Sequence, residues 1–161
     1  MADSDMIRGI VHIQCPLPEV FAFIADYRND PAWRKEVRSV KYTTPEPVAA
    51  AGSQCVEIAR ILGRQRETWL EVTRCEKDAG IASVTFHASV PHASERAVRQ
   101  SGEGTALEYR IQYDNGQAWM RRFLRPMRRG AETRRLIRAL AKLKQLLENR
   151  RISDPRNGGL S

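Results

Sequence analysis

Two tyrosines in the last strand-like segment are polar side chains that could do chemistry. Residues 104–114 alternate between apolar and polar side chains, which predicts a half-buried strand with Tyr109 and Tyr113 on its inner face. A hydroxyl in such a place can orient the carbonyl group of a ligand or act as a weak acid. A core tyrosine that bonds to the backbone or to water explains the same pattern equally well.

Arg60 is the second kind of candidate. It falls in the first of two strands, 53–62 and 66–76, that we expect to form a hairpin centred near Gln65. In that register the more apolar face also carries Arg60, whose guanidinium would point inward and bind carboxylate or enolate oxygens. Arg60 and Tyr109 are therefore the candidate catalytic pair, in which one stabilises an enolate and the other donates a proton. A register shifted by one residue, or an arginine that extends to the rim, is the alternative.

Thiols and imidazoles give a weaker signal. The same register places Cys55 opposite Cys75, where two thiols could oxidise or bind a metal together with His12 or His87. Small packing residues are the alternative, because three cysteines without paired C-x-x-C spacing form neither a disulfide scaffold nor a zinc ribbon. No serine lies in a G-x-S-x-G motif, so a hydrolytic triad is not supported. We expect no metal and no cofactor.

The net charge of +8 belongs to one segment. Residues 119–151 hold 12 Lys and Arg against two acidic residues, whereas residues 1–118 carry a net charge of −2. Arg134, Arg138 and Lys142 share one side of the predicted helix, opposite its leucines. That side can be a solvated outer face, a surface for peripheral contact with an anionic membrane, or a nucleic-acid surface. Nucleic acid is the least favoured, because aromatic interleaving and a base-reading motif are both missing.

Composition indicates a single globular protein. Of the 161 residues 42% are hydrophobic and 29% are charged, a balance typical of one domain, which we place at 1–151 with a flexible tail at 152–161. The acidic start of the chain does not resemble a signal peptide, and no apolar stretch is long enough to cross a bilayer. We therefore expect a cytoplasmic protein; its oligomeric state is left open.

Hydrophobic periodicity and turn signals predict the order of the elements. A strand at 6–14 is followed by a helix from Pro18 to Asp26 and by a short second helix, with Asn29 or Asp30 as its N-cap and Pro31 as its first residue. Six antiparallel strands come next, at 36–44, 53–62, 66–76, 80–90, 93–101 and 104–114.

A helical period then continues to about Arg150. Its two apolar stripes are out of phase, with Pro126 and Gly130 between them, so we expect two helical segments or one kinked helix.

Several local motifs match one known family. Pro18-Glu19-Val20-Phe21-Ala22-Phe23-Ile24-Ala25-Asp26, followed by Pro31-Ala32-Trp33, is similar to the opening P-x-x-V-[WF]-x-[FL]-[IL]-x-D... P-x-W of that family. Gly52, the segment 69–73, Gly104-Thr105 and the closing helix 136–147 complete the match. Over residues 6–149 the chain thus resembles the SRPBCC (START and birch-pollen-allergen) superfamily, in particular its polyketide cyclase/dehydrase-like branch.

The resemblance implies an α+β helix-grip fold. A curved six- to seven-stranded antiparallel sheet would wrap around the long C-terminal helix, with two short helices after the first strand. It also implies an internal cavity that holds a small hydrophobic molecule (a lipid, polyketide or isoprenoid-like compound) in a carrier or sensor. A minority of such proteins are polyketide aromatase/cyclases or dehydratase-like enzymes. The expected cavity-facing residues are Trp33, Arg60, Phe86, Tyr109, Tyr113, Phe123 and Met127.

Overall fold

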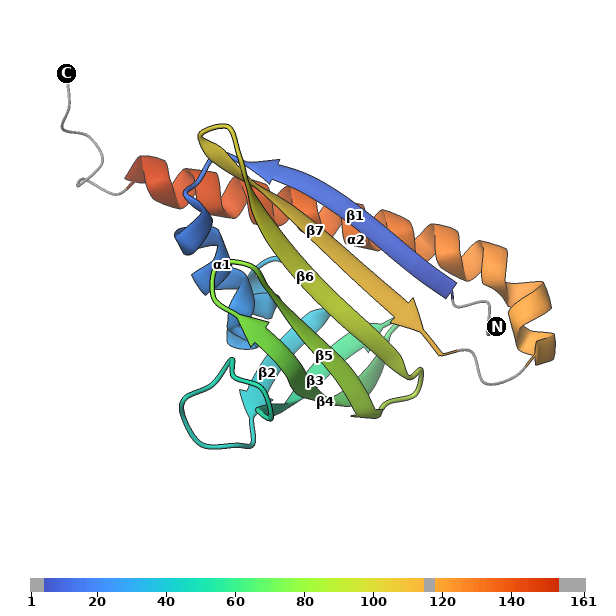
Figure 1. Ribbon diagram of the computed structural model, residues 1–161. Coiled ribbons are helices and arrows are strands. Elements are labelled where there is room, and N and C mark those ends of the chain that lie inside the picture. Colours follow the sequence, from blue (N-terminus) through green and yellow to red (C-terminus); the bar gives the residue numbers. More distant parts are fainter. Residues whose placement is uncertain (1–4, 115–117, 154–161) are drawn as a thin grey trace, which may run out of the picture.

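The fold is one antiparallel sheet around one long helix (Figure 1). The computed structural model describes residues 5–114 and 118–153, with the side chains of 118–126 left out. Seven strands form the sheet in the order β1-β7-β6-β5-β4-β3-β2. They are β1 (Asp5–Ile13), β2 (Val37–Tyr42), β3 (Gln54–Ile61), β4 (Arg64–Glu76), β5 (Gly80–His87), β6 (His92–Ser101) and β7 (Gly104–Tyr113).

Three helices complete the domain. The helix α1 (Leu17–Ala25) and the 3-10 helix η1 (Tyr27–Ala32) connect β1 to β2, and α2 (Ala118–Ser153) closes the chain. Figure 1 shows α2 lying along β1, with the curved sheet around it. The predicted α+β helix-grip fold is therefore confirmed, with seven strands. None of the helices in the described part of the chain is long and apolar enough to span a membrane. The division into 1–151 and 152–161 stays a prediction.

The core lies between α2 and the inner face of the sheet. Leucines at helical spacing on α2 are buried there: Leu136, Leu140, Leu143 and Leu147. The approach of α2 to β1 is so close that a Cβ atom on Gly9 would lie 2.6 Å from Cδ1 of Leu140. A side chain at position 9 would therefore force the buried Leu140 side chain to move, so Gly9 favours this close approach of the strand and the helix.

Of two predicted helix features, one is confirmed and one needs correction. The C-terminal segment is one helix of 36 residues that contains Pro126, and Figure 1 shows its first turns at an angle to the rest, which is the predicted alternative of one kinked helix. The N-cap of η1 is Asp26, whose carboxylate accepts a hydrogen bond from the backbone N–H of Arg28 at 3.0 Å. Asp30 is buried instead, and it has an ion-pairing role described below.

The register of the β3–β4 hairpin also differs from the prediction. Arg60 pairs with Gln65, and the turn lies at Leu62 and Gly63, both at positive φ (50° and 76°), which permits a tight two-residue turn. Cys55 consequently pairs with Leu70, and the predicted pairing of Cys55 with Cys75 is wrong. The inner face of β3 carries Cys55, Glu57, Ala59 and Ile61. Arg60 alternates with them, so its predicted inward orientation is wrong as well.

Candidate functional site

A cavity of about 420 Å³ lies between α2 and the inner face of the sheet. Strands β3 and β7 form one wall, and the turns of α2 from residue 128 to residue 139 form the other. Most of the lining surface is apolar, and nine of the 21 lining residues are aliphatic: Ile7, Ala59, Ile61, Leu62, Val90, Ile111, Ala131, Leu136 and Ala139. The volume lies within the range of about 300–1,000 Å³ that is usual for small-molecule sites. The cavity is thus large enough for a small organic molecule with apolar groups.

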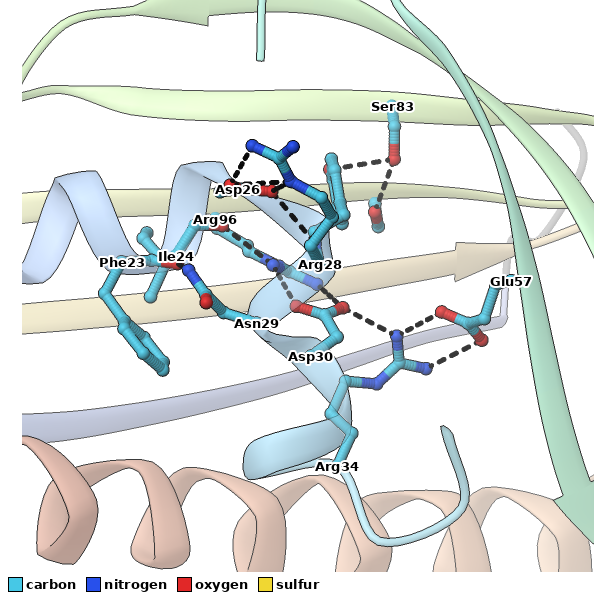
Figure 2. Close-up of polar contacts among 12 residues, drawn as sticks. Phe23, Ile24, Asp26, Arg28, Asn29, Asp30, Arg34, Glu57, Ser83 and Arg96 are labelled. Atoms are coloured by element: carbon cyan, nitrogen blue, oxygen red, sulfur yellow. Dashed lines mark hydrogen bonds and ion pairs between the residues drawn. The ribbon is translucent and has the colours of Figure 1, made fainter. Parts of the chain in front are cut away.

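One side of the cavity is a charged pair (Figure 2). Nη1 of Arg34 donates to Oε2 of Glu57 at 2.6 Å, and Nη2 donates to Oε1 at 3.3 Å. Burial alone would lower the pKa of Arg34, but the carboxylates of Glu57 and Asp30 raise it well above its usual value. The guanidinium therefore stays charged, and it offers the cavity a fixed ionic group.

Arg34 is held in place by a buried ion pair between Asp30 and Arg96, which we call the buried brace (Figure 2). Asp30, within η1, accepts hydrogen bonds from Nη1 of Arg34 at 3.0 Å and from Nη1 and Nη2 of Arg96 at 2.9 and 2.5 Å. Arg96 projects from β6, is 0% exposed, and also donates to the carbonyl oxygen of Ile24 at 2.8 Å. A chain of alternating charges thus runs from Arg96 through Asp30 and Arg34 to Glu57 at the cavity wall.

Aromatic rings surround the Arg96 guanidinium. Its central carbon lies 4.4 Å from the ring centroid of Tyr27, 5.2 Å from that of Trp33 and 5.0 Å from that of Tyr109. Ring faces attract a cation in a desolvated site. They therefore help to stabilise the charge where water does not reach it.

A histidine and a tyrosine line another part of the cavity. Nδ1 of His92 lies 3.1 Å from the carbonyl oxygen of Val90. Because a carbonyl oxygen only accepts, the neutral ring carries its proton on Nδ1 and keeps Nε2 as a base. Burial lowers the pKa of His92, although the bond to Val90 acts in the opposite direction, so the ring is neutral at pH 7.

Tyr113 packs against this imidazole, with ring centroids 5.6 Å apart. Its hydroxyl donates to Oε2 of Glu132 on α2 at 3.4 Å. Burial raises the pKa of Tyr113, and the charge of Glu132 raises it further. The hydroxyl is therefore protonated; with its proton donated to Glu132, its oxygen remains a hydrogen-bond acceptor in the cavity wall.

A second hollow, of about 520 Å³, adjoins the cavity. It lies between α2, the end of β3 and the segment 33–38 that leads into β2. Residues common to both linings are Glu36, Ile61, Leu62, Ala131, Arg135 and Ala139. We call it the basic hollow, because seven cationic side chains line it: Lys35, Arg38, Arg60, Arg134, Arg135, Arg138 and Lys142.

Sequence comparison decides the family. The profile of the family described as polyketide cyclase / dehydrase and lipid transport matches residues 7–148. This chain belongs to that family. No curated protein matches the chain.

Solved structures support the same fold for this family member. TTHA0849 from Thermus thermophilus superposes with a TM-score of 0.74 at 16% identity, covering 87% of this chain and 94% of that one. A START superfamily protein from Mycobacterium smegmatis gives a TM-score of 0.65 at 14% identity, over 90% and 95% of the two chains. The di-domain ARO/CYC BexL of the BE-7585A biosynthetic pathway gives 0.70 at 17% identity, over 87% of this chain and 48% of that chain. At these identities the likeness concerns the fold alone.

The expected cavity residues of this family member divide into two groups. Tyr109 and Tyr113 line the cavity. Trp33 is 1% exposed, packs 6.1 Å from the ring of Tyr109, and lines the basic hollow rather than the cavity. Arg60 is exposed at the rim of that hollow, on the other face of β3 from the cavity-lining residues. The candidate pair of Arg60 and Tyr109 is therefore not brought together.

The remaining expected residues lie outside the cavity. Phe86 is 54% exposed and packs against Trp69, because Ile81 and Ser83 form the buried side of β5. Met127 is 78% exposed and is not part of the cavity wall. Phe123 falls outside the described side chains. Placing Phe86 and Met127 in the cavity is thus wrong.

Several charged or titratable residues of the site were missed, among them Arg34, Glu57, His92 and Arg96. A usable signal existed for two of them. Arg96 alternates with Ser94 and Val98 on the buried face of β6, and Glu57 alternates with the small residues Cys55 and Ala59. A charged residue on a face of small or apolar residues indicates a buried ion pair.

Proposed function

We propose that this protein binds a small, largely hydrophobic molecule in the cavity between the sheet and α2, as a carrier or sensor. The cavity itself carries the proposal: its volume is about 420 Å³ and most of its lining surface is apolar. Membership of a family described by polyketide chemistry and lipid transport supports it.

The polar groups of the cavity restrict the ligand further. The Arg34–Glu57 pair and the hydroxyls of Tyr109 and Tyr113 all line it. Buried polar groups favour ligands that satisfy them and disfavour ligands that leave them unpaired. The ligand therefore has an apolar skeleton with carbonyl or hydroxyl oxygens.

A cavity-filling substitution tests the binding proposal. In Ala59→Phe the new ring enters the cavity, because Ala59 lines it and is buried. Val84→Phe, on the exposed side of β5, is the matched control. We expect the parent and the control to bind the fluorescent apolar probe ANS and to carry a co-purified small molecule in native mass spectrometry. Ala59→Phe should lose both; equal probe binding by all three proteins would refute the proposal.

His92 favours one second candidate, an enzyme that acts on a carbonyl compound. Nε2 of the neutral imidazole can accept a proton from a carbon next to a carbonyl group. The C–H electron pair then moves to form the enolate, whose charge rests on the carbonyl oxygen. This is the first step of a cyclisation. It does not involve Arg60, which lies on the other face of β3.

Hydrogen exchange tests this second candidate. A 1,3-diketone in D₂O should exchange its methylene protons faster with the parent protein than without it, as followed by NMR. His92→Gln should abolish that excess rate, whereas His87→Gln, at an exposed position, should not change it. An excess rate that survives in His92→Gln refutes the role of His92.

A further inference from the structure

The basic hollow concentrates positive charge on two facing walls. Arg134, Arg138 and Lys142 are exposed at intervals of four residues, which aligns them on one side of α2. Lys35, Arg38 and Arg60 come from the opposite wall. Arg135, the seventh cation of the lining, forms an ion pair with Glu132 at 2.7 Å. The other six cations, around about 520 Å³, repel one another and produce a strongly positive potential in the space between them.

Among the described residues, carboxylates neutralise only a small part of this charge. Within residues 5–114 and 127–153, none of the six cations other than Arg135 takes part in an ion pair. Glu36, the acidic residue in the lining, pairs with Nε of Arg34 at 3.5 Å. Unpaired cations around one space favour an anion in it.

The hollow continues into the apolar cavity. Ile61 and Leu62 on β3 and its turn, and Ala131 and Ala139 on α2, line both spaces. A single molecule can therefore occupy both, with an apolar part among the aliphatic side chains and an anionic end among the cations.

We infer that the basic hollow binds a phosphate-type head group of an amphiphile whose apolar part occupies the cavity. This inference rests on the proposed binding function and adds the chemical class of the ligand. Guanidinium groups match the oxygens of phosphate through paired hydrogen bonds, and four of the six cations are arginines. The facing walls fit a compact head group better than a flat membrane surface, which would meet only the outer side of α2.

Dodecyl phosphate and dodecanol, both below micelle-forming concentration, separate the contribution of the head group. We expect the parent to bind dodecyl phosphate about tenfold more tightly, since several contacts of the size of exposed ion pairs add up to that factor. The preference should shrink in high salt, which screens exposed charges. Inorganic pyrophosphate should compete with dodecyl phosphate and leave dodecanol binding unchanged.

Two triple variants make the test specific. The variant Arg134→Gln/Arg138→Gln/Lys142→Gln should lose the preference for the phosphate while its affinity for dodecanol stays the same. The control Lys41→Gln/Lys77→Gln/Arg99→Gln removes three exposed charges elsewhere and should keep the preference. Circular dichroism checks that both variants are folded.

The outcomes distinguish the inference from the proposed function. If the parent binds the two probes with equal affinity and Ala59→Phe blocks dodecanol binding, the inference is overturned and the proposed function stands. If pyrophosphate binding requires the three α2 cations and dodecanol does not bind, the result supports the anion site and counts against ligand binding in the apolar cavity. If binding to anionic vesicles requires the same cations and the two soluble probes bind with equal affinity, the head-group inference is overturned in favour of a membrane contact.

Discussion

The buried brace between Arg96 and Asp30 predicts an asymmetry between two substitutions. Arg96→Met removes the guanidinium, but Asp30 keeps the hydrogen bond from Nη1 of Arg34 at 3.0 Å. Asp30→Asn removes the carboxylate charge and leaves the Arg96 guanidinium buried, with the carbonyl oxygen of Ile24 and ring faces as its remaining partners. The aspartate substitution should therefore be the more damaging of the two.

The magnitude follows from burial of both side chains, which are 1% and 0% exposed. Breaking a buried pair at one partner costs about 3–5 kcal/mol, because the other charge loses its compensation. We assign about 3 kcal/mol to Arg96→Met, since Arg34 still compensates Asp30, and about 5 kcal/mol to Asp30→Asn. The double variant should lose less than the sum of the two, because it leaves neither charge buried alone.

Urea denaturation measures these losses. With a denaturant dependence of about 2 kcal/mol per M, the midpoint should fall by about 1.5 M for Arg96→Met and by about 2.5 M for Asp30→Asn. If Asp30→Asn unfolds the protein outright, Arg96→Met and the double variant still give the comparison. Losses below about 1 kcal/mol for both, or a larger loss for Arg96→Met, would refute the reasoning.

Three further predictions concern packing and protonation. Gly9→Val should lower the free energy of unfolding by about 1–3 kcal/mol in urea, because its side chain meets Leu140, and Leu140→Ala should relieve part of that loss. Burial lowers the pKa of His92 in the folded state, so the unfolded chain takes up the proton at a higher pH than the folded protein does. The free energy of unfolding should therefore decrease as the pH drops below about 6.5. In His92→Gln this decrease between about pH 7 and pH 5 should be smaller. Burial also raises the pKa of Cys55 to about 12. Iodoacetamide at about pH 8 should therefore not modify Cys55 in the native protein, whereas it should modify Cys55 after urea unfolds the chain. Mass spectrometry measures the modification.

The fold was predictable because its signals are local. In β7 the alternation that ends at Tyr113 fixes which side chains face α2, and the leucine stripe of α2 fixes which side of the helix is buried. Turn signals between the strands then leave few ways to connect them. None of these signals depends on residues far apart in the chain.

The inner face of β3 was not predictable in the same way. Val56 and Ile58 make the outer face the more apolar one in the sequence, while the inner face carries Cys55, Glu57 and Ala59. Ala59 and Glu57 line the cavity, so the space in front of them belongs to the cavity and not to packed apolar side chains. The usual inference that the more apolar face points inward therefore failed at the strand that lines the site.

The series of ion pairs from Arg96 through Asp30 and Arg34 to Glu57 connects the core with the cavity wall. Asp30 and Arg96 are 66 residues apart in sequence, so only the tertiary structure brings them together. Asp30 binds Arg96 on one side and Arg34 on the other, and Arg34 binds Glu57 in the cavity wall. Because Arg96 and Asp30 are fixed in the core, the Arg34–Glu57 pair at the cavity has little freedom to reorient when a ligand enters. The cavity can then discriminate ligands by where their oxygens lie, since the fixed pair does not adapt to a misplaced group.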